Sequence, residues 1–195
     1  MSAPRVIGGS ARGRRLRPVP GDSTRPITDR AKEALFNILQ PSLQGAALLD
    51  VFAGTGAVGI EALSRGAGFV RFLDNKRAAV ETVRQNLQTT GLGQGAEIFL
   101  GDAFTHLAGK PGRAFDYVFI APPQYHKLWQ RALLAVDAQP DWLVDDGWTI
   151  VQIDPREYEA LELQNLEEFD QRKYGNTLLV FYERKGPVIA SEPTA

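Results

Sequence analysis

The chain of 195 residues has a hydrophobic fraction of 44% and a charged fraction of 23%, which are ordinary values for one globular domain. It contains no Cys and two His, so disulfides, Cys-ligated zinc and a thiol nucleophile are excluded and no metal site is expected. No run of about 18 apolar residues is present, and the N-terminus lacks the apolar core of a signal peptide. We therefore expect a cytoplasmic protein without membrane contact, and a monomer by default.

The net charge of −1 is distributed unevenly along the chain. Residues 1–35 hold eight Lys and Arg against three Asp and Glu, a net charge of +5, so residues 36–195 carry −6. This asymmetry favours a basic segment that binds a polyanion such as nucleic acid. The alternative is that this basic segment is exposed to solvent and contributes only to solubility. The candidates for phosphate contact are Arg12, Arg14, Arg15 and Arg17.

Apolar runs and helical spacing alternate along most of the chain. Helices are predicted over residues 28–40, 58–65, 75–91 and about 128–136. Strands are predicted over residues 47–52, 69–73, 96–100, 115–120 and 148–153, followed by a hairpin of 167–174 and 177–183. Strands that alternate with helices predict a doubly wound, mainly parallel α/β sheet of seven strands, with the hairpin adding an antiparallel edge.

The expected domain organisation has three parts. Residues 1–27 mix β-formers with Gly and Arg and form a basic hairpin or a mobile arm. Residues 28–185 form the α/β domain, and residues 186–195 form a frayed tail.

The strongest motif follows the first predicted strand. Asp50 precedes a turn containing Gly54, Thr55 and Gly56, and residues 54–59 also fit the dinucleotide-binding pattern. Asp74 ends the second strand, twenty residues after Gly54, where a carboxylate can bind ribose hydroxyls. Asp102 follows the third strand, within reach of an adenine amine. These residues predict a nucleoside-containing ligand at the carboxyl edge of the sheet.

Two ligand classes fit this motif. A nicotinamide cofactor would place a pyrophosphate at the turn, where the charge of Asp50 would repel it. The ammonium and sulfonium groups of S-adenosylmethionine would be attracted instead, and the closing hairpin is not needed in a dinucleotide-binding fold. S-Adenosylmethionine is therefore the preferred ligand and a nicotinamide cofactor the rival. A P-loop is excluded, because no Gly-Lys-Ser/Thr follows the turn.

A second motif, Ala121-Pro122-Pro123-Gln124-Tyr125, follows the fourth predicted strand. Pro residues lack an N–H group, so the Pro122 carbonyl is expected to be rigid and free to accept a hydrogen bond from an amino group. Tyr125 can stack on a base. The structural alternative is a simple strand stop, with Tyr125 covering the core. Beside a methyl-donor site, an acceptor site is the preferred interpretation.

The chain resembles the RsmD family of bacterial enzymes that methylate guanine N2 in small-subunit (16S) ribosomal RNA. The matching segments cover about residues 4–185 and are 5–9, 13–16, 25–30, 33–39, 50–56 and 174–175. The resemblance implies a Rossmann-like class I methyltransferase that uses S-adenosylmethionine and binds ribosomal RNA or the small-subunit particle. The glycine motif is shared by many methyltransferases, whereas the N-terminal segments are more discriminating.

One site departs from the family pattern. The family usually has Asp or Asn before Pro-Pro and an aromatic residue directly after it, where this chain has Ala121 and Gln124. The acceptor is then the Pro122 carbonyl alone or with Gln124, unless activity is lost. The catalytic candidates are Pro122, Gln124 and Tyr125. The cofactor-binding candidates are Asp50, Phe52, Gly54, Thr55, Gly56, Asp74, Asp102 and Ala121.

Two further functions remain as alternatives. Because Ala121 lacks a side-chain acceptor, the chain could be an RNA-binding ribosome-assembly protein with weakened catalysis. Such a protein would have no need of a donor pocket. A small-molecule methyltransferase is disfavoured by the basic N-terminal segment.

Overall fold

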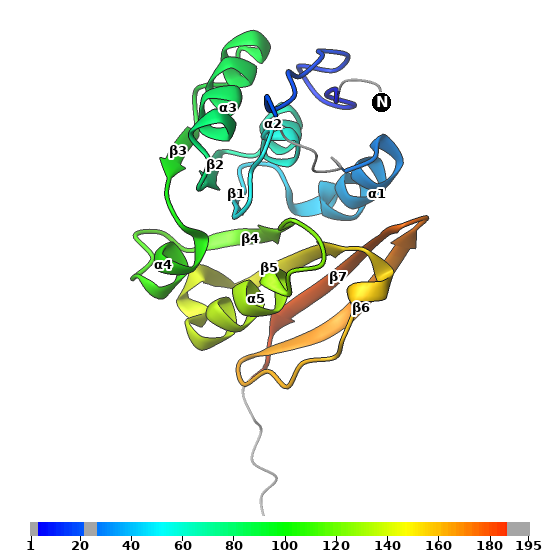
Figure 1. Ribbon diagram of the computed structural model, residues 1–195, viewed down its shortest axis with the longest axis vertical. Coiled ribbons are helices and arrows are strands. Elements are labelled where there is room, and N and C mark those ends of the chain that lie inside the picture. The colour runs from blue at the N-terminus through cyan, green and yellow to red at the C-terminus, as the bar shows by residue number, and fades with distance from the viewer. Residues whose placement is uncertain (1–3, 22–26, 187–195) are drawn as a thin grey trace, which may run out of the picture.

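The computed structural model describes residues 4–21 and 27–186 (Figure 1). Its described helices are α1 (Asp29–Leu39), α2 (Ala57–Ser64), α3 (Arg77–Thr90), α4 (Ala103–Ala108) and α5 (Leu128–Ala138). Its strands are β1 (Ala47–Asp50), β2 (Phe69–Asp74), β3 (Ala96–Leu100), β4 (Phe115–Ile120), β5 (Leu143–Ile153), β6 (Leu166–Tyr174) and β7 (Thr177–Arg184). Three short 3₁₀ turns cover Gln40–Ser42, Pro140–Trp142 and Pro155–Glu157.

The strands form one seven-stranded sheet in the order β3-β2-β1-β4-β5-β7-β6. The first five strands are parallel to one another, and β7 pairs antiparallel with both β5 and β6. The predicted fold is therefore confirmed, including the antiparallel hairpin at one edge. Because β1 to β5 run in the same direction, their carboxyl ends lie at one edge of the sheet.

Helices cover both faces of the sheet (Figure 1). One apolar core contains residues of α1, α2 and α3 together with Tyr117 and Phe119 of β4. The second contains residues of α4 and α5 together with Val118 and Ile120. This alternation along β4 is the pattern of a strand buried on both faces, and it places the strand ends between two helical layers.

The helix ends show where local prediction succeeded and where it failed. The Thr28 side chain accepts a hydrogen bond from the Ala31 N–H (3.2 Å), so the predicted start of α1 is confirmed. The helix predicted to begin at Asn75 begins instead at Arg77: the cap position is Lys76, whose N–H donates to Asp74 Oδ1 (2.9 Å). Helix α4 was not predicted, because its six residues are too few for a periodic pattern.

The N-terminal segment, defined here as residues 4–21, packs onto the α/β body (Figure 1). Within it, Arg5 and Arg15 form an isolated antiparallel bridge. The Arg17 N–H donates to Asn86 Oδ1 on α3 (2.7 Å). At Gly9, which has φ +75°, an added Cβ would lie 1.8 Å from the Ser64 carbonyl oxygen at the end of α2. Only Gly allows the backbone to approach α2 this closely.

Some expectations fall on residues outside this description. They are Arg25 and Pro26 of the family motif and most of the tail expected at 186–195.

Candidate active site

The glycine turn after β1 is fixed by hydrogen bonds from two directions. Gly56 has φ +76° and starts α2. The Gly54 N–H donates to Asp74 Oδ2 (2.9 Å), and the Asn86 side chain donates to the Thr55 carbonyl (2.9 Å). Gly54 has φ +53°, and an added Cβ there would meet open space. The turn is therefore held rigid while one of its sides stays open to a ligand.

Asp50 lies at the end of β1, beneath this turn, and is 2% exposed. Its Oδ2 accepts one long hydrogen bond from the Gly59 N–H (3.4 Å). Burial raises the pKa of Asp50 to about 7, the Gly59 N–H opposes the shift, and the charge of Asp74 adds to it. A cation bound beside this carboxyl would favour its charged form.

The other predicted donor-site residues follow neighbouring strands. Because β3, β2, β1 and β4 are adjacent, their carboxyl ends bring Asp102, Asp74, Asp50 and Ala121 to one edge of the sheet. Asp102 is exposed and caps α4, and the Thr105 N–H that it accepts lowers its pKa. Phe52 is half-buried, with its ring 6.2 Å from the Phe104 ring.

The loop after β4 has a strained, well-tethered conformation. Pro122 is buried, whereas Tyr125 is 59% exposed and has φ +65°, which is uncommon for a residue with a side chain. The Tyr125 N–H donates to Glu157 Oε1 (2.5 Å), and its hydroxyl donates to Asp154 Oδ2 (3.0 Å). These bonds fix the Tyr125 ring beside the end of β5 instead of over the core.

Asp154 is the centre of this tether. Its Oδ1 accepts from the backbone N–H and Nε of Arg156, and its Oδ2 accepts from Arg156 Nη2 and Tyr125. The Arg156 guanidinium holds the pKa of Asp154 well below its usual range. Asp154 is therefore an ionised carboxylate with both oxygens occupied.

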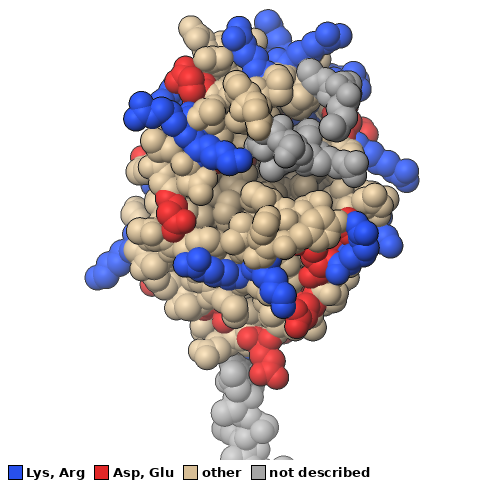
Figure 2. Space-filling view, in the orientation of Figure 1, with Lys and Arg blue, Asp and Glu red and all other residues tan. Residues whose placement is uncertain are grey.

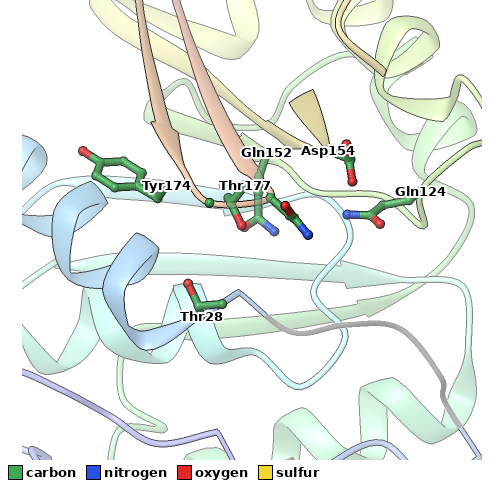
Figure 3. Close-up of a pocket in the computed structure, with 8 residues that line it drawn as sticks. Thr28, Gln124, Gln152, Asp154, Tyr174 and Thr177 are labelled. Atoms are coloured by element: carbon green, nitrogen blue, oxygen red, sulfur yellow. The ribbon is translucent and has the colours of Figure 1, made fainter. Parts of the chain in front are cut away.

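A pocket of about 360 Å³ opens beside this loop (Figure 3). Its lining residues come from the start of α1, the loop after β4, the end of β5 and the β6–β7 turn: Thr28, Gln124, Gln152, Asp154, Tyr174, Gly175, Asn176 and Thr177. Three segments of the sequence motifs therefore meet here, although they are far apart in the chain. In Figure 3 the Gln124 and Gln152 side chains lie across the cavity from Thr28.

Sequence reasoning missed Gln152 and Asp154 as pocket residues. Asp154 lies at the carboxyl end of a parallel strand, as Asp50 and Asp74 do, so the same rule would have found it. Gln152 gives no such indication, because one polar residue in a strand is ordinary alternation.

The predicted phosphate-binding arginines lie on the N-terminal segment. Arg12, Arg14, Arg15 and Arg17 are all exposed, and Arg17 Nη1 donates to Gln85 Oε1 (3.2 Å). Figure 2 shows Lys and Arg side chains gathered at this end of the molecule and beside a central hollow. The arginines are thus available to an extended anionic ligand.

None of the helices in residues 4–21 and 27–186 is both long and apolar enough to cross a membrane. Within the same residues, no group of three or more His, Cys, Asp or Glu side chains is placed to hold a metal ion.

The strand order, the antiparallel β7 beside β5 and the glycine turn after β1 define a class I methyltransferase fold. The chain belongs to the RsmD family: the family model described as "Conserved hypothetical protein 95" matches residues 4–183. The resemblance seen in the sequence motifs is thereby confirmed.

Several relatives support this assignment. YlbH of Bacillus subtilis strain 168, whose name provisionally assigns it to the rRNA methyltransferases, is 40% identical over 185 residues, covering 93% of this chain and 100% of that protein. Ribosomal RNA small subunit methyltransferase D of Escherichia coli K12 is 41% identical over 145 residues, covering 74% of this chain and 68% of that protein. The solved structure of yhhF from Escherichia coli, provisionally named a methyltransferase, has a TM-score of 0.81 at 34% identity, covering 93% of this chain and 97% of that one.

Proposed function

We propose that this protein transfers a methyl group from S-adenosylmethionine to the exocyclic N2 of a guanine in small-subunit ribosomal RNA, in the cytoplasm. The observation that carries the proposal is the pocket at which the segments around Thr28 and Tyr174, which match the family, meet the loop at Gln124, beside the strand ends that hold the glycine turn. The names of the relatives support ribosomal RNA as the substrate.

The donor edge of the sheet fits S-adenosylmethionine. Asp50 is a buried carboxyl that accepts one long hydrogen bond from the described part of the chain, which suits a cationic neighbour better than a phosphate. The open side of Gly54 allows a ligand to approach the backbone, and Asp74 is placed to receive ribose hydroxyls. The proposed donor-binding residues are Asp50, Phe52, Gly54, Thr55, Gly56, Asp74, Asp102 and Ala121. When bound, the donor supplies a methyl group on a positively charged sulfur.

The residues of the acceptor loop have to position a weak nucleophile. The lone pair of a guanine amine is delocalised into the ring, so alignment with the methyl group and hydrogen bonds from its N–H groups are both needed. Positioning lowers such barriers by about 7–11 kcal/mol at best. We assign this task to Pro122 and Gln124, with Tyr125 stacking on the unstacked base. The bond from Tyr125 to Asp154 supports that role, because it fixes the ring before substrate arrives.

The N-terminal segment supplies the proposed contact with RNA. Its exposed arginines can bind phosphates without reading sequence, which would orient the RNA over the pocket. In this assignment residues 1–27 serve RNA binding and residues 28–185 form the methyltransferase domain.

A second candidate function is a ribosome-assembly protein that binds RNA with little catalysis. Ala121 favours it, because the side chain cannot accept a hydrogen bond where the family has Asp or Asn. The tethered glycine turn and the buried Asp50 favour the enzyme.

The test is transfer of tritiated methyl groups to small-subunit ribosomal RNA, both free and in particles from a strain that lacks this gene. Nucleoside analysis should yield N2-methylguanosine. Asp50→Ala serves as the control that abolishes donor binding. Methyl transfer to another nucleoside would contradict the guanine assignment, and no transfer to either substrate would favour the assembly protein.

A further inference from the structure

Gln152 of β5 contains a buried hydrogen-bond acceptor without a partner. Its Oε1 atom is shielded from solvent and accepts no hydrogen bond in the described structure. A buried polar atom of this kind destabilises a fold, so native proteins rarely retain one without a ligand or a role. A few other described residues also have a buried side-chain atom without a partner. Of all these residues, only Gln152 lines the pocket at Thr28.

Gln152 lies on the strand next to Ala121, the position at which this chain departs from the family pattern. In the parallel pair of β4 and β5, Ile120 lies opposite Val151. The next residues along the two strands are Ala121 and Gln152, so these two side chains leave the sheet at neighbouring positions. Gln152 thus carries a side-chain acceptor on the strand next to the position at which Ala121 has none.

The other pocket residues are less suited to this role. Both oxygens of Asp154 are occupied by Arg156 and Tyr125. The Thr28 hydroxyl oxygen already accepts the Ala31 N–H as the cap of α1. Gln124 is on an exposed loop position, whereas Gln152 is half-buried on a strand of the sheet and is held in place by its neighbours. Gln152 is the better preorganised acceptor.

We propose that Gln152 Oε1 accepts an N–H of the target amine and thereby takes over the task of the family's Asp or Asn before Pro-Pro. This inference rests on the proposed function. The amine has two hydrogens, so Gln152 and the Pro122–Gln124 loop can each receive one. During transfer the nitrogen lone pair forms the new N–C bond, the C–S electron pair returns to sulfur, and one N–H proton leaves to water. Gln152 stabilises the positive charge that develops on nitrogen and does not take the proton.

The test compares three variants in single-turnover methyl transfer to small-subunit particles, at saturating donor. Gln152→Leu should lower the transfer rate about 100- to 1,000-fold. Its donor affinity should be unchanged and its melting temperature equal or higher, because an unpaired buried acceptor is removed. Gln152→Glu should restore transfer at pH 8 and lose it as the new carboxyl is protonated at lower pH, which a purely structural role would not produce.

Thr149→Val is the matched control. Thr149 lies on the same strand, also contains a buried unpaired oxygen, and faces the other side of the sheet, outside the pocket. This variant should alter stability only. A wild-type rate in Gln152→Leu, or an equal loss in Thr149→Val, would overturn the inference. If Gln152→Leu does not fold, a wild-type pH profile in Gln152→Glu overturns it instead. Absence of guanine methylation by the wild-type protein would overturn the proposed function, and the inference with it.

Discussion

The Lys32 ammonium lies 3.3 Å from a carboxylate oxygen of Glu61, and the two side chains are 1% and 0% exposed. The same carboxylate accepts the backbone N–H groups of Ile7 (2.9 Å) and Gly8 (2.7 Å), and Lys32 also donates to the Arg5 carbonyl. Burial lowers the pKa of Lys32, and Glu61 opposes that shift. This ion pair therefore joins α1, α2 and the N-terminal segment.

Glu61→Gln should destabilise the protein strongly, because Lys32 would be left as a buried charge without its counterion. Breaking such a pair costs about 3–5 kcal/mol of unfolding free energy. Urea denaturation followed by fluorescence measures the change. Glu81→Gln is the control, since Glu81 is 54% exposed and pairs with Arg84 at the surface. That variant should change stability by less than about 1 kcal/mol, and an equal effect of the two variants would contradict the role given to Glu61.

The sequence predicted the strands and the glycine turn well, because apolar runs, Gly and strand-end Asp residues are local patterns. The pair of Lys32 with Glu61 could not be predicted in this way. Glu61 lies in a short helix that is buried along its whole length, and its partners are 29 and about 54 residues distant in sequence. The docking of residues 4–21 depends on these long-range contacts, so the sequence left a hairpin and a mobile arm equally open. The pocket was likewise hidden, because it combines four separate segments.

The buried Asp50 makes stability depend on pH. Its folded pKa of about 7 lies above the ordinary pKa of 3.8 for an Asp carboxyl, so the folded state binds the proton more tightly than the unfolded state. The resulting stabilisation is fully present below pH 3.8 and is lost as the pH rises through about 7. Asp50→Asn should remove this dependence and raise the unfolding free energy at pH 8 by a few kcal/mol, since one pKa unit is worth about 1.4 kcal/mol.

The same substitution should weaken S-adenosylmethionine binding, because a neutral amide cannot attract the cationic donor. In the wild-type protein, donor affinity should fall as the pH drops below about 7 and Asp50 becomes protonated. Calorimetry between pH 5.5 and 8.5 would measure both effects. A tighter or equally tight complex in Asp50→Asn would contradict the donor-site assignment, while the stability prediction would stand separately.

Replacing Arg12, Arg14, Arg15 and Arg17 together with Gln should weaken RNA binding and its dependence on salt. The slope of log affinity against log salt should fall by roughly one unit for each lost phosphate contact. Donor affinity should not change. The control replaces Arg113, which is exposed just before the start of β4 and lies over the Phe69 ring at the start of β2, away from the carboxyl ends of the strands. An unchanged salt slope in the quadruple variant would identify the segment as structural only.

Tyr125 and Gln124 should affect different steps. Tyr125→Ala should weaken RNA binding by about 1–3 kcal/mol if the ring stacks on the target base. Gln124→Ala should leave both binding constants near those of the wild type and lower the transfer rate. Filter binding and single-turnover assays on the same preparations separate the two effects. The assignments would be reversed if the rate loss occurred in Tyr125→Ala with its binding unchanged.

Ala121→Asp restores the common family residue and tests whether the acceptor has moved from β4 to β5. In the wild-type background the new carboxylate should preserve or raise the transfer rate. In the Gln152→Leu background it should recover most of the lost rate, because an acceptor returns at the neighbouring strand position. The cost should appear in stability, since Ala121 is half-buried and Asp50 and Asp154 already place negative charge near this edge. Single-turnover rates of the two single variants and the double variant form a mutant cycle. The double variant must be folded and must bind the donor for this comparison. If its transfer rate is then no higher than that of Gln152→Leu, the two positions do not share one task.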